Sequence, residues 1–428
     1  MANFLRSGHD THSLYSEGAL VANNHTILTI DGSRYSGSGT IVRQAVAFSA
    51  LTGRPIRVIR ARAKRAKPGL RPQHVRVVEA IAQLVDGHTE GLAQGSQEFS
   101  FHPGPLVAGR PYTWDIGSAG STTMLALGVL PVLAFTASPV SVELRGGLFQ
   151  DFAPSAFHLQ YVLLPLLHRM GLQATVLMGR PGYVPQGHGR LTLVVQPLTV
   201  PFEALNHDHP GPVTSVWGIA LSSHLSERQV SRRMADAAHR VLAQAGYPAE
   251  IEIRQDTEAV QRGAALALFA EEGNGVRLGA DQAGARQRTA EAIGHHVAQQ
   301  LIDDLRTGST LDRHAADQII PFAAMARGVS RFIIPAVTDH VQTSAWLAEL
   351  FFDARVTYDR RHLVIQGAAV HPRRPASAHP VSPHDPGKDL AVRPPHRGEI
   401  AAAMLKSMTR LDDPGKGNGR RDRDETGR

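Results

Sequence analysis

The segment SRYSGSGTIVR, residues 33–43, has the residue types of a phosphate-binding loop. Gly37 and Gly39 let a ligand approach the backbone, and the backbone N–H groups at the start of a helix favour anions. Arg43 adds a guanidinium that can form paired hydrogen bonds with phosphate oxygens. A flexible turn between a strand and a helix would also contain such small residues, so both interpretations stay open at this point.

A strongly basic stretch follows this segment. From Arg54 to Arg76 the chain carries nine Lys and Arg residues and no Asp or Glu. Such a cluster creates a local positive field, which attracts phosphate groups and releases counterions when it binds them. A solvated basic face of the protein would have the same composition.

The composition of the whole chain excludes some kinds of protein and some kinds of binding site. The formal net charge is +7, but residues 371–428 contribute +4 of it, from 12 Lys and Arg against 8 Asp and Glu, so the remainder is only slightly basic. The chain has no cysteine, which excludes disulfides and thiolate metal sites and suits a reducing compartment. Because no apolar run has the length of a signal peptide or a membrane span, we expect a cytoplasmic protein.

The elements that must position these residues follow a repeated order. A β-branched strand at 26–30 precedes the loop, a helix at 40–53 ends at a glycine, and a strand follows at 55–59. A second helix starts at Pro72. The succession of helix, short turn and strands returns three more times. Because strands often come in pairs after a helix, we expect an α+β fold with helices on one face of mixed sheets rather than a doubly wound parallel sheet.

Composition also suggests the domain boundaries. The polar segment 202–214 contains Pro and Gly and could begin an inserted subdomain, and the end of the chain is too poor in apolar residues to fold. The predicted organisation is a flexible N-terminal segment at 1–25, a main domain at 26–200 and 270–367, an inserted domain at 201–269, and a disordered Pro- and Arg-rich tail at 368–428.

Six segments occur in the order, and at about the spacing, seen in RNA 3'-terminal phosphate cyclases. The segments are LTIDGSRYSGSGTIVRQAVAFSALTGRPIRV, RAKRAKPGLRPQH, DIGSAGSTTM, GYVPQGHGRL, HAADQIIPFAAMA and DHVQTSAWLAELF. The chain resembles this family from about Thr26 to about Gly367, and KPGLRPQH is the most specific match. The resemblance implies repeated βαβαββ modules, like the C-terminal domain of translation initiation factor three, and a smaller inserted α/β domain.

The resemblance also implies an ATP-dependent, ligase-like reaction that converts an RNA 3'-phosphate to a 2',3'-cyclic phosphate. In that scheme a histidine attacks the α-phosphorus of ATP, pyrophosphate leaves, and a histidine–AMP phosphoramidate forms. AMP then passes to the RNA phosphate, and the neighbouring 2'-hydroxyl displaces it. The implied cofactors are ATP and the Mg²⁺ or Mn²⁺ that accompanies it, and the implied partner is an RNA with a 3'-phosphate end.

Individual residues take roles from the same resemblance. His340 lies at the position of the adenylylated histidine, and Asp317 could orient it and stabilise its charged form. Arg43 completes the implied catalytic set. The implied nucleotide-binding residues are Gly37, Gly39, His314, Gln318, Arg62 and Arg65, and the implied substrate-binding residues are Gln73 and His74. Without the resemblance, each of these side chains would be interpreted as an ordinary surface, capping or first-turn residue, and no metal motif made of protein side chains alone is visible.

Several positions depart from the family pattern. The family loop usually reads GEGGGQILR, whereas this chain has Ser36 for the glutamate and Thr40 for the glutamine. The lost carboxylate removes a metal ligand or a phosphate-orienting group, and a hydroxyl does not replace its charge. Further departures are Leu127, residues 148–152 and Phe157.

Three functions are consistent with these residues. The first is a divergent cyclase with an adenylylated His340. The second is a catalytically weak or inactive cyclase-like RNA-binding scaffold in RNA processing or ribosome assembly, which would not need His340. The third is an activity on a small anionic substrate, since the fold of the family is similar to that of enolpyruvyl transferases. His340 and Asp317 favour the first function, and Ser36 and Thr40 favour the second.

Overall fold

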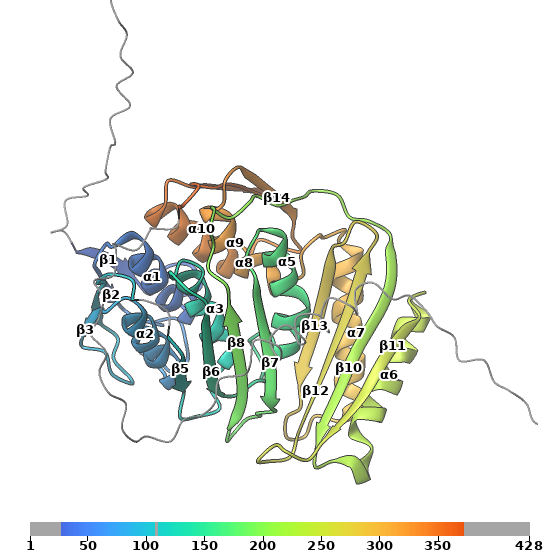
Figure 1. The fold of residues 1–428 in the computed structure, drawn as a ribbon. Helices are drawn as coiled ribbons and strands as arrows, with labels where there is room; N and C mark the ends of the chain where they lie inside the picture. Colours follow the sequence, from blue (N-terminus) through green and yellow to red (C-terminus); the bar gives the residue numbers. More distant parts are fainter. Residues whose placement is uncertain (1–26, 108–109, 372–428) are drawn as a thin grey trace, which may run out of the picture. The chain divides into compact units, whose positions relative to one another are not determined.

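The computed structural model describes residues 27–107 and 110–371 of the chain. Within these residues the chain forms four four-stranded sheets that combine parallel and antiparallel neighbours, with helices packed against them (Figure 1). This confirms the predicted α+β class with mixed sheets. The predicted flexible segment 1–25 lies outside the described residues, as do residues 372–428 of the predicted tail.

The first module contains the glycine loop. Its elements are β1 (Leu28–Asp31), α1 (Gly39–Thr52), β2 (Ile56–Ile59), α2 (Pro72–Leu84), β3 (His88–Glu90) and β4 (Phe99–His102). β1 and β2 pair in parallel because a helix connects them, and β4 pairs antiparallel with both β2 and β3. The Ser38 side chain accepts a hydrogen bond from the Thr40 N–H and caps α1, and Gly53 ends this helix at a φ of 74°.

The order βαβαββ returns in a second module. Its strands and first helix are β5 (Tyr112–Asp115), α3 (Thr122–Leu133), β6 (Val140–Gly146), β7 (Ala174–Arg180) and β8 (Gly189–Val195). The second helical segment contains α4 (Ala156–His158), a π-helical turn (Leu159–Leu163) and α5 (Leu164–Arg169).

A third module has the same order. Its elements are β9 (Asn206–His207), α8 (Ala315–Gln318), α9 (Ile320–Met325), β14 (Val329–Ile333), α10 (Asp339–Phe351), β15 (Arg355–Asp359) and β16 (His362–Gln366). The three sheets are ordered β1-β2-β4-β3, β5-β6-β8-β7 and β9-β14-β16-β15, so corresponding strands take corresponding places. These modules confirm the predicted βαβαββ repeat.

A fourth sheet interrupts the third module between β9 and α8. Its segment contains β10 (Val213–Ser223), a 3₁₀ turn (Ser226–Arg228), α6 (Val230–Gln244), β11 (Ala249–Asp256), β12 (Gly263–Glu272), β13 (Arg277–Ala283) and α7 (Ala290–Arg306). The strand order is β11-β10-β12-β13, and α6 and α7 lie side by side against this sheet (Figure 1). Leu266 and Val297 belong to a hydrophobic cluster of this segment. Residue 269, where the inserted domain was predicted to end, lies inside β12, and the domain boundaries stay a prediction.

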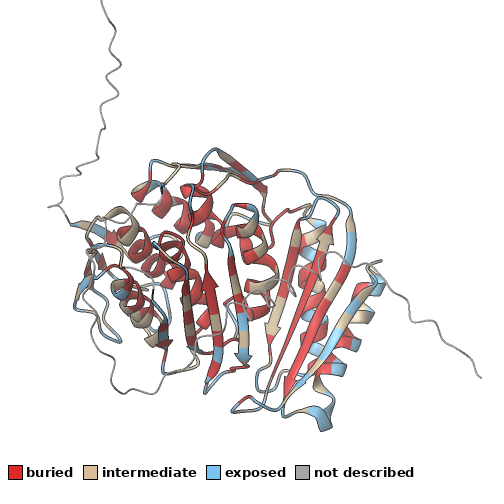
Figure 2. Cartoon of the chain, in the orientation of Figure 1, coloured by how far each residue is buried: buried red, intermediate tan, exposed pale blue. Residues whose placement is uncertain are grey.

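The three modules share a second, larger hydrophobic cluster, which occupies the buried interior in Figure 2. Ile41 of α1, Leu125 of α3 and Ile320 of α9 have no exposed surface within it. α1 packs against α2, α3 and α10, although α1 and α10 are far apart in the sequence. This packing places the glycine loop beside the first turns of α10.

The end of the described chain is held to the third module. The backbone N–H groups of Ala368, Ala369 and Val370 donate hydrogen bonds to the carbonyls of residues 324–326. These three residues belong to the tail that was predicted to be disordered. Of the helices that the structure describes, none combines the length and the apolar character that crossing a membrane requires.

Candidate active site

The glycine loop contacts the first turns of α10 through hydroxyl groups. The Ser36 N–H donates to Thr343 Oγ1 at 3.2 Å, and the Ser36 and Ser38 hydroxyls lie 3.0 Å apart. Two positions that are acidic or glycine in the family loop are therefore serines bonded to each other. Thr343, which the sequence did not single out, fixes the distance between the loop and α10.

His340 lies in the first turn of α10 and faces the start of α1. Its Nδ1 lies 3.1 Å from Thr40 Oγ1, and 40% of its side chain is exposed. Partial burial lowers the pKa of His340 to about 4, and the nearby charges of Arg43 and Arg65 act in the same direction. The imidazole is therefore neutral at pH 7, and it has one ring nitrogen free of this contact.

Asp317 of α8 lies behind His340. Its Oδ2 is 4.0 Å from His340 Nδ1 and accepts a hydrogen bond from Gln318 Nε2 at 2.7 Å. Burial raises the pKa of Asp317 to about 7, although the charge of Arg43 opposes this change. The carboxyl group is thus close to half ionised at neutral pH, which is the range useful for acid or base chemistry.

Arg43 is nearly fully buried beneath the same site. Its Nη2 lies 3.5 Å from Thr40 Oγ1, at the long limit of a hydrogen bond. Burial lowers its pKa to about 10, and the charge of Asp317 partly restores it. The structure therefore brings the three predicted catalytic residues together around Thr40, which the sequence had marked only as a departure from the family pattern.

The glycines of the loop meet two different needs. Gly37 has a φ of 50°, in the left-handed region, and a Cβ there would meet the Lys64 side chain. A Cβ on Gly39 would lie 2.2 Å from His74 Nε2, so only a glycine lets α1 and α2 approach this closely. Both glycines are buried, which makes them supports of the loop whether or not a phosphate binds there.

The predicted substrate pair is engaged with the protein itself. His74 Nδ1 accepts a hydrogen bond from the Arg71 N–H at 3.0 Å, and burial lowers the pKa of His74 to about 3. Gln73 Oε1 accepts a hydrogen bond from the Ser121 N–H at 3.0 Å. These bonds order the start of α2 and the turn before α3.

Arg62 and Arg65 differ in their availability. Arg62 Nη1 donates to the carbonyls of Lys67 and Gly69, at 2.9 and 2.6 Å, so its guanidinium holds its own loop together. Arg65 is exposed and lies near enough to His340 and His74 to lower the pKa of both. Arg65 is therefore the better placed of the two to meet an anion.

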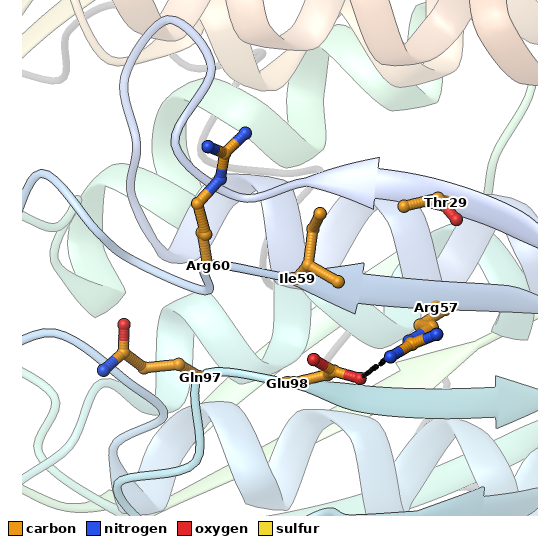
Figure 3. A pocket seen from close by; sticks show the side chains of 6 residues that line it. All are labelled: Thr29, Arg57, Ile59, Arg60, Gln97 and Glu98. Atoms are coloured by element: carbon orange, nitrogen blue, oxygen red, sulfur yellow. Dashed lines mark hydrogen bonds and ion pairs between the residues drawn. The ribbon is translucent and has the colours of Figure 1, made fainter.

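Other members of the basic stretch are paired with acids. Arg57 pairs with Glu98, Arg60 with Asp31, and Arg76 with Glu79. These pairs reduce the positive field that composition alone suggested. Figure 3 shows the result in a shallow hollow of about 530 Å³ on the first sheet, where Arg57 and Glu98 face each other. This hollow is lined by Thr29, Arg57, Ile59, Arg60, Gln97 and Glu98 and does not include His340.

His314 connects the site to a buried ion pair that the sequence did not reveal. Its ring centroid lies 5.4 Å from that of His158, edge to face. His158 Nε2 lies 2.9 Å from Asp312 Oδ2, and neither side chain has any exposed surface. Asp312 Oδ1 also accepts hydrogen bonds from the N–H groups of His314 and Ala315 at the start of α8. Isolated His and Asp residues 154 positions apart form no sequence motif, so no local signal predicted this contact.

A metal site made of the protein alone is not found in the part of the chain that the structure describes. Among those residues no three His, Cys, Asp or Glu side chains are grouped so that they could hold a metal ion. Ser36, at the position of the family glutamate, has its hydroxyl within hydrogen-bonding distance of Ser38 and Thr343. The glycine loop thus offers no charged metal ligand at that position.

Comparison with known proteins identifies the family. The model of the family described as RNA 3'-terminal phosphate cyclase matches residues 34–358. The RNA 3'-terminal phosphate cyclase of Methanopyrus kandleri is 38% identical over 342 residues, which cover 77% of this chain and 95% of that protein. The enzymes of the same name from Methylococcus capsulatus and Pyrobaculum neutrophilum are 38% and 33% identical, over 92% and 94% of their lengths and 77% of this chain. The chain belongs to the RNA 3'-terminal phosphate cyclase family.

Proposed function

We propose that this chain uses ATP to convert the 3'-phosphate end of an RNA to a 2',3'-cyclic phosphate, through a covalent adenylate on His340. The observation that carries the proposal is the position of a neutral His340 imidazole, 3.1 Å from Thr40 and beside Asp317 and Arg43, in a member of the cyclase family. A neutral imidazole nitrogen is a competent nucleophile at pH 7.

The first step forms the adenylate. His340 Nδ1 faces Thr40, so Nε2 is the nitrogen left to attack. The Nε2 lone pair forms a bond to the α-phosphorus of ATP, and the bond from that phosphorus to the bridging oxygen breaks, so that pyrophosphate leaves with the electron pair. The ring becomes positively charged, and the ionised form of Asp317, 4.0 Å from Nδ1, stabilises that charge.

The later steps transfer AMP and close the ring. An oxygen of the RNA 3'-phosphate attacks the adenylate phosphorus, and the bond to His340 Nε2 breaks. The 2'-hydroxyl oxygen then attacks the 3'-phosphorus, its proton is lost, and AMP leaves with the bridging oxygen. Arg43 and the exposed Arg65 stabilise the charge on the transferring phosphates. Gly37 and Gly39 are proposed to act on the nucleotide site through the packing of the loop against Lys64 and His74.

The divalent ion that accompanies ATP brings charge neutralisation of the phosphates. Because Ser36 replaces the family glutamate, we assign no protein carboxylate of this loop to that ion. His314 and Gln318 are proposed to contact the nucleotide, since both lie on the α8 segment that carries Asp317. Gln73 and His74 are proposed to support the RNA-binding surface through the loops they order.

A labelling experiment tests the proposal. The full chain is incubated with ATP labelled at the α-phosphate and with Mg²⁺ or Mn²⁺, and the protein is examined for a covalent adduct. We expect an adduct that His340→Ala abolishes and that His295→Ala, a change in an exposed histidine of α7, leaves intact. The absence of an adduct with both ions would overturn the proposal.

The Ser36 contacts favour a second candidate function, an RNA-binding scaffold with weak or no activity. Its hydroxyl is shared with Ser38 and Thr343 and carries no charge toward a nucleotide. In that case Arg65→Ala weakens the binding of 3'-phosphate RNA, whereas His340→Ala does not. Restoration of the adduct by the double change Ser36→Glu and Thr40→Gln would identify the loop as the cause of the inactivity.

A further inference from the structure

An aromatic and cationic cluster lies at the outer edge of the glycine loop. It consists of Arg34, Tyr35 and Trp346, and we refer to it as the Arg34 cluster. Arg34 Cζ lies 4.6 Å from the centroid of the Trp346 ring and 5.0 Å from that of Tyr35, and the two rings are 6.0 Å apart. The guanidinium therefore lies over the ring of a tryptophan that α10 supplies.

The guanidinium of Arg34 is available to a ligand. Arg34 is exposed, and within the described residues its side chain has no carboxylate partner. The one hydrogen bond that this side chain makes there is from Nη2 to the Tyr35 hydroxyl, at 3.3 Å. Trp346 packs against the main hydrophobic cluster on its inner side. The ring that lies beside the guanidinium is therefore anchored in the protein.

The backbone of Tyr35 is strained in a way that maintains this cluster. Its φ is 44°, a left-handed conformation that is unfavourable for a residue with a Cβ. The family loop begins with a glycine at this position. Lys64 Nζ donates a hydrogen bond of 2.6 Å to the Tyr35 carbonyl and holds the strained residue in place. Strain of this kind concentrates at functional sites, and here it keeps an aromatic side chain beside Arg34.

The Arg34 cluster is close to the proposed catalytic histidine. Trp346 follows His340 by six positions on α10, which corresponds to about 9 Å along the helix axis. Ser36, one residue after Tyr35, contacts Thr343 between them. The basic residues Lys64, Arg65 and Lys67 are exposed on the neighbouring loop, so a polyanion that reaches His340 would find cations and flat side chains together.

We propose that the solvent-facing side of Arg34 stacks against a nucleobase near the 3' end of single-stranded RNA. Arg34 would then lie between this base and the Trp346 ring. The proposal rests on the proposed function, because it names a subsite for the same substrate. Arginine guanidinium planes and aromatic rings are the groups on which unpaired bases stack, and every base offers a π-face. The subsite therefore requires a base without preferring one sequence.

A binding experiment separates base stacking from attraction to the backbone. Two short single-stranded RNAs with a 3'-phosphate and a fluorescent 5' label are compared by anisotropy: one has natural bases, and the other has abasic sugars at its last nucleotides. We expect the full chain to bind the natural RNA about 10-fold more tightly, since stacking contributes roughly 1–3 kcal/mol per base. Arg34→Lys, which keeps the charge but loses the plane, is expected to abolish this preference.

The controls decide between the remaining explanations. Arg240→Ala, which removes an exposed arginine of α6, should keep the 10-fold preference if the effect belongs to Arg34 and not to total charge. Equal binding of the two RNAs by the unchanged chain would overturn the proposal and would indicate a purely electrostatic contact. An undiminished preference in Arg34→Lys would also overturn it, because the base would then stack on another group. Trp346→Leu provides a second measurement, because it removes the aromatic ring that lies beside the Arg34 guanidinium.

The failure of the base-stacking subsite can be told from the failure of the proposed function. Adduct formation from ATP needs no RNA, whereas anisotropy needs no catalysis. A chain that forms the adduct but lacks the base preference retains the cyclase function and loses the subsite. A chain that shows the preference without an adduct retains the subsite and loses the cyclase function.

Discussion

His158 and His340 each lie beside an aspartate, but the two pairs differ in depth and in distance. His158 is fully buried and lies 2.9 Å from Asp312, whereas His340 is 40% exposed on its side chain and lies 4.0 Å from Asp317. The pKa of His158 is raised and that of Asp312 is lowered to about 2. The pKa of His340 is lowered to about 4 and that of Asp317 is raised to about 7.

The pKa values of the two pairs shift in opposite directions because the groups that surround each pair differ. Burial alone lowers the pKa of His158, but the charge and hydrogen bonds of Asp312 overcome it, and Asp312 also accepts bonds from three backbone N–H groups. Asp317 has a single side-chain donor, Gln318, and no direct bond to His340. Arg43 and Arg65 further disfavour a second positive charge on His340.

This difference suggests a separate role for each pair: His158 and Asp312 support the fold, and His340 and Asp317 are proposed to take part in the reaction. The His158–Asp312 contact joins the second module, the start of α8 and β13, since the Gly279 N–H also donates to Asp312. In the His340–Asp317 pair the imidazole is neutral at pH 7 and the carboxyl group is close to half ionised, so the carboxyl group can change protonation near neutral pH. A partly exposed His340, the proposed nucleophile, beside a rigid buried pair is the arrangement that we expect of a site built on packed modules.

The largest effect is expected from removing the buried carboxylate. Asp312→Ala should lower the free energy of unfolding by about 3–5 kcal/mol, because it leaves the buried His158 imidazole and three backbone N–H groups without their acceptor. Asp317→Ala should cost about 1 kcal/mol, since it removes one side-chain hydrogen bond, the one that Gln318 donates. Urea unfolding at pH 7 measures both values. Equal losses would show that the two pairs do not differ as described.

The sequence predicted those features of the molecule that residues close together in the chain determine. Gly53 marks the end of α1 and Pro72 the start of α2, so these two helices of the first module could be predicted from the sequence. The third module could not, because its first strand, β9, has two residues and the fourth sheet follows it directly. The family motifs placed His340 and Asp317 without showing what contacts them.

The contacts that decide the chemistry join distant parts of the chain. Thr40 and His340 are 300 positions apart, and the threonine counted as a loss when only the family glutamine was considered. Trp346 and Arg34 meet for the same reason, because α1 packs against α10. No pattern of composition or periodicity reports such pairings, and neither the domain boundaries nor the site roles go beyond predictions.

The second effect concerns the role of Asp317 in adduct formation. Asp317→Asn should slow labelling of His340 about 100-fold, since the amide cannot stabilise the charged ring. In the unchanged chain the rate should rise as the pH increases through about 7, where Asp317 ionises, while His340 stays neutral down to about 4. Asp317→Asn should lose the step near pH 7. Asp236→Asn, an exposed change on α6, serves as the control.

The third effect tests whether a hydroxyl replaces part of the family glutamine. Thr40→Val keeps the size of the side chain but removes the contact with His340 Nδ1, and we expect labelling to slow about 10-fold. Thr40→Ser keeps the hydroxyl and should retain most of the rate. Rates of adduct formation at saturating ATP give the comparison. Labelling of Thr40→Val as fast as that of the unchanged chain would remove Thr40 from the site.

The smallest effect is a difference in the pH dependence of stability. The folded pKa of His340, about 4, lies below its unfolded value of 6.5, so the unfolded chain binds more protons between these values and stability falls as the pH decreases from 6.5 toward 4. His340→Ala should show a shallower loss over this range. His158 acts in the opposite sense: its folded pKa is raised, so its contribution is complete below 6.5 and is lost as the pH rises through the folded value. Unfolding free energies measured from pH 4 to 9 for the unchanged chain and for His340→Ala give both slopes, and an unchanged slope below 6.5 in His340→Ala would contradict the assignment of a neutral imidazole.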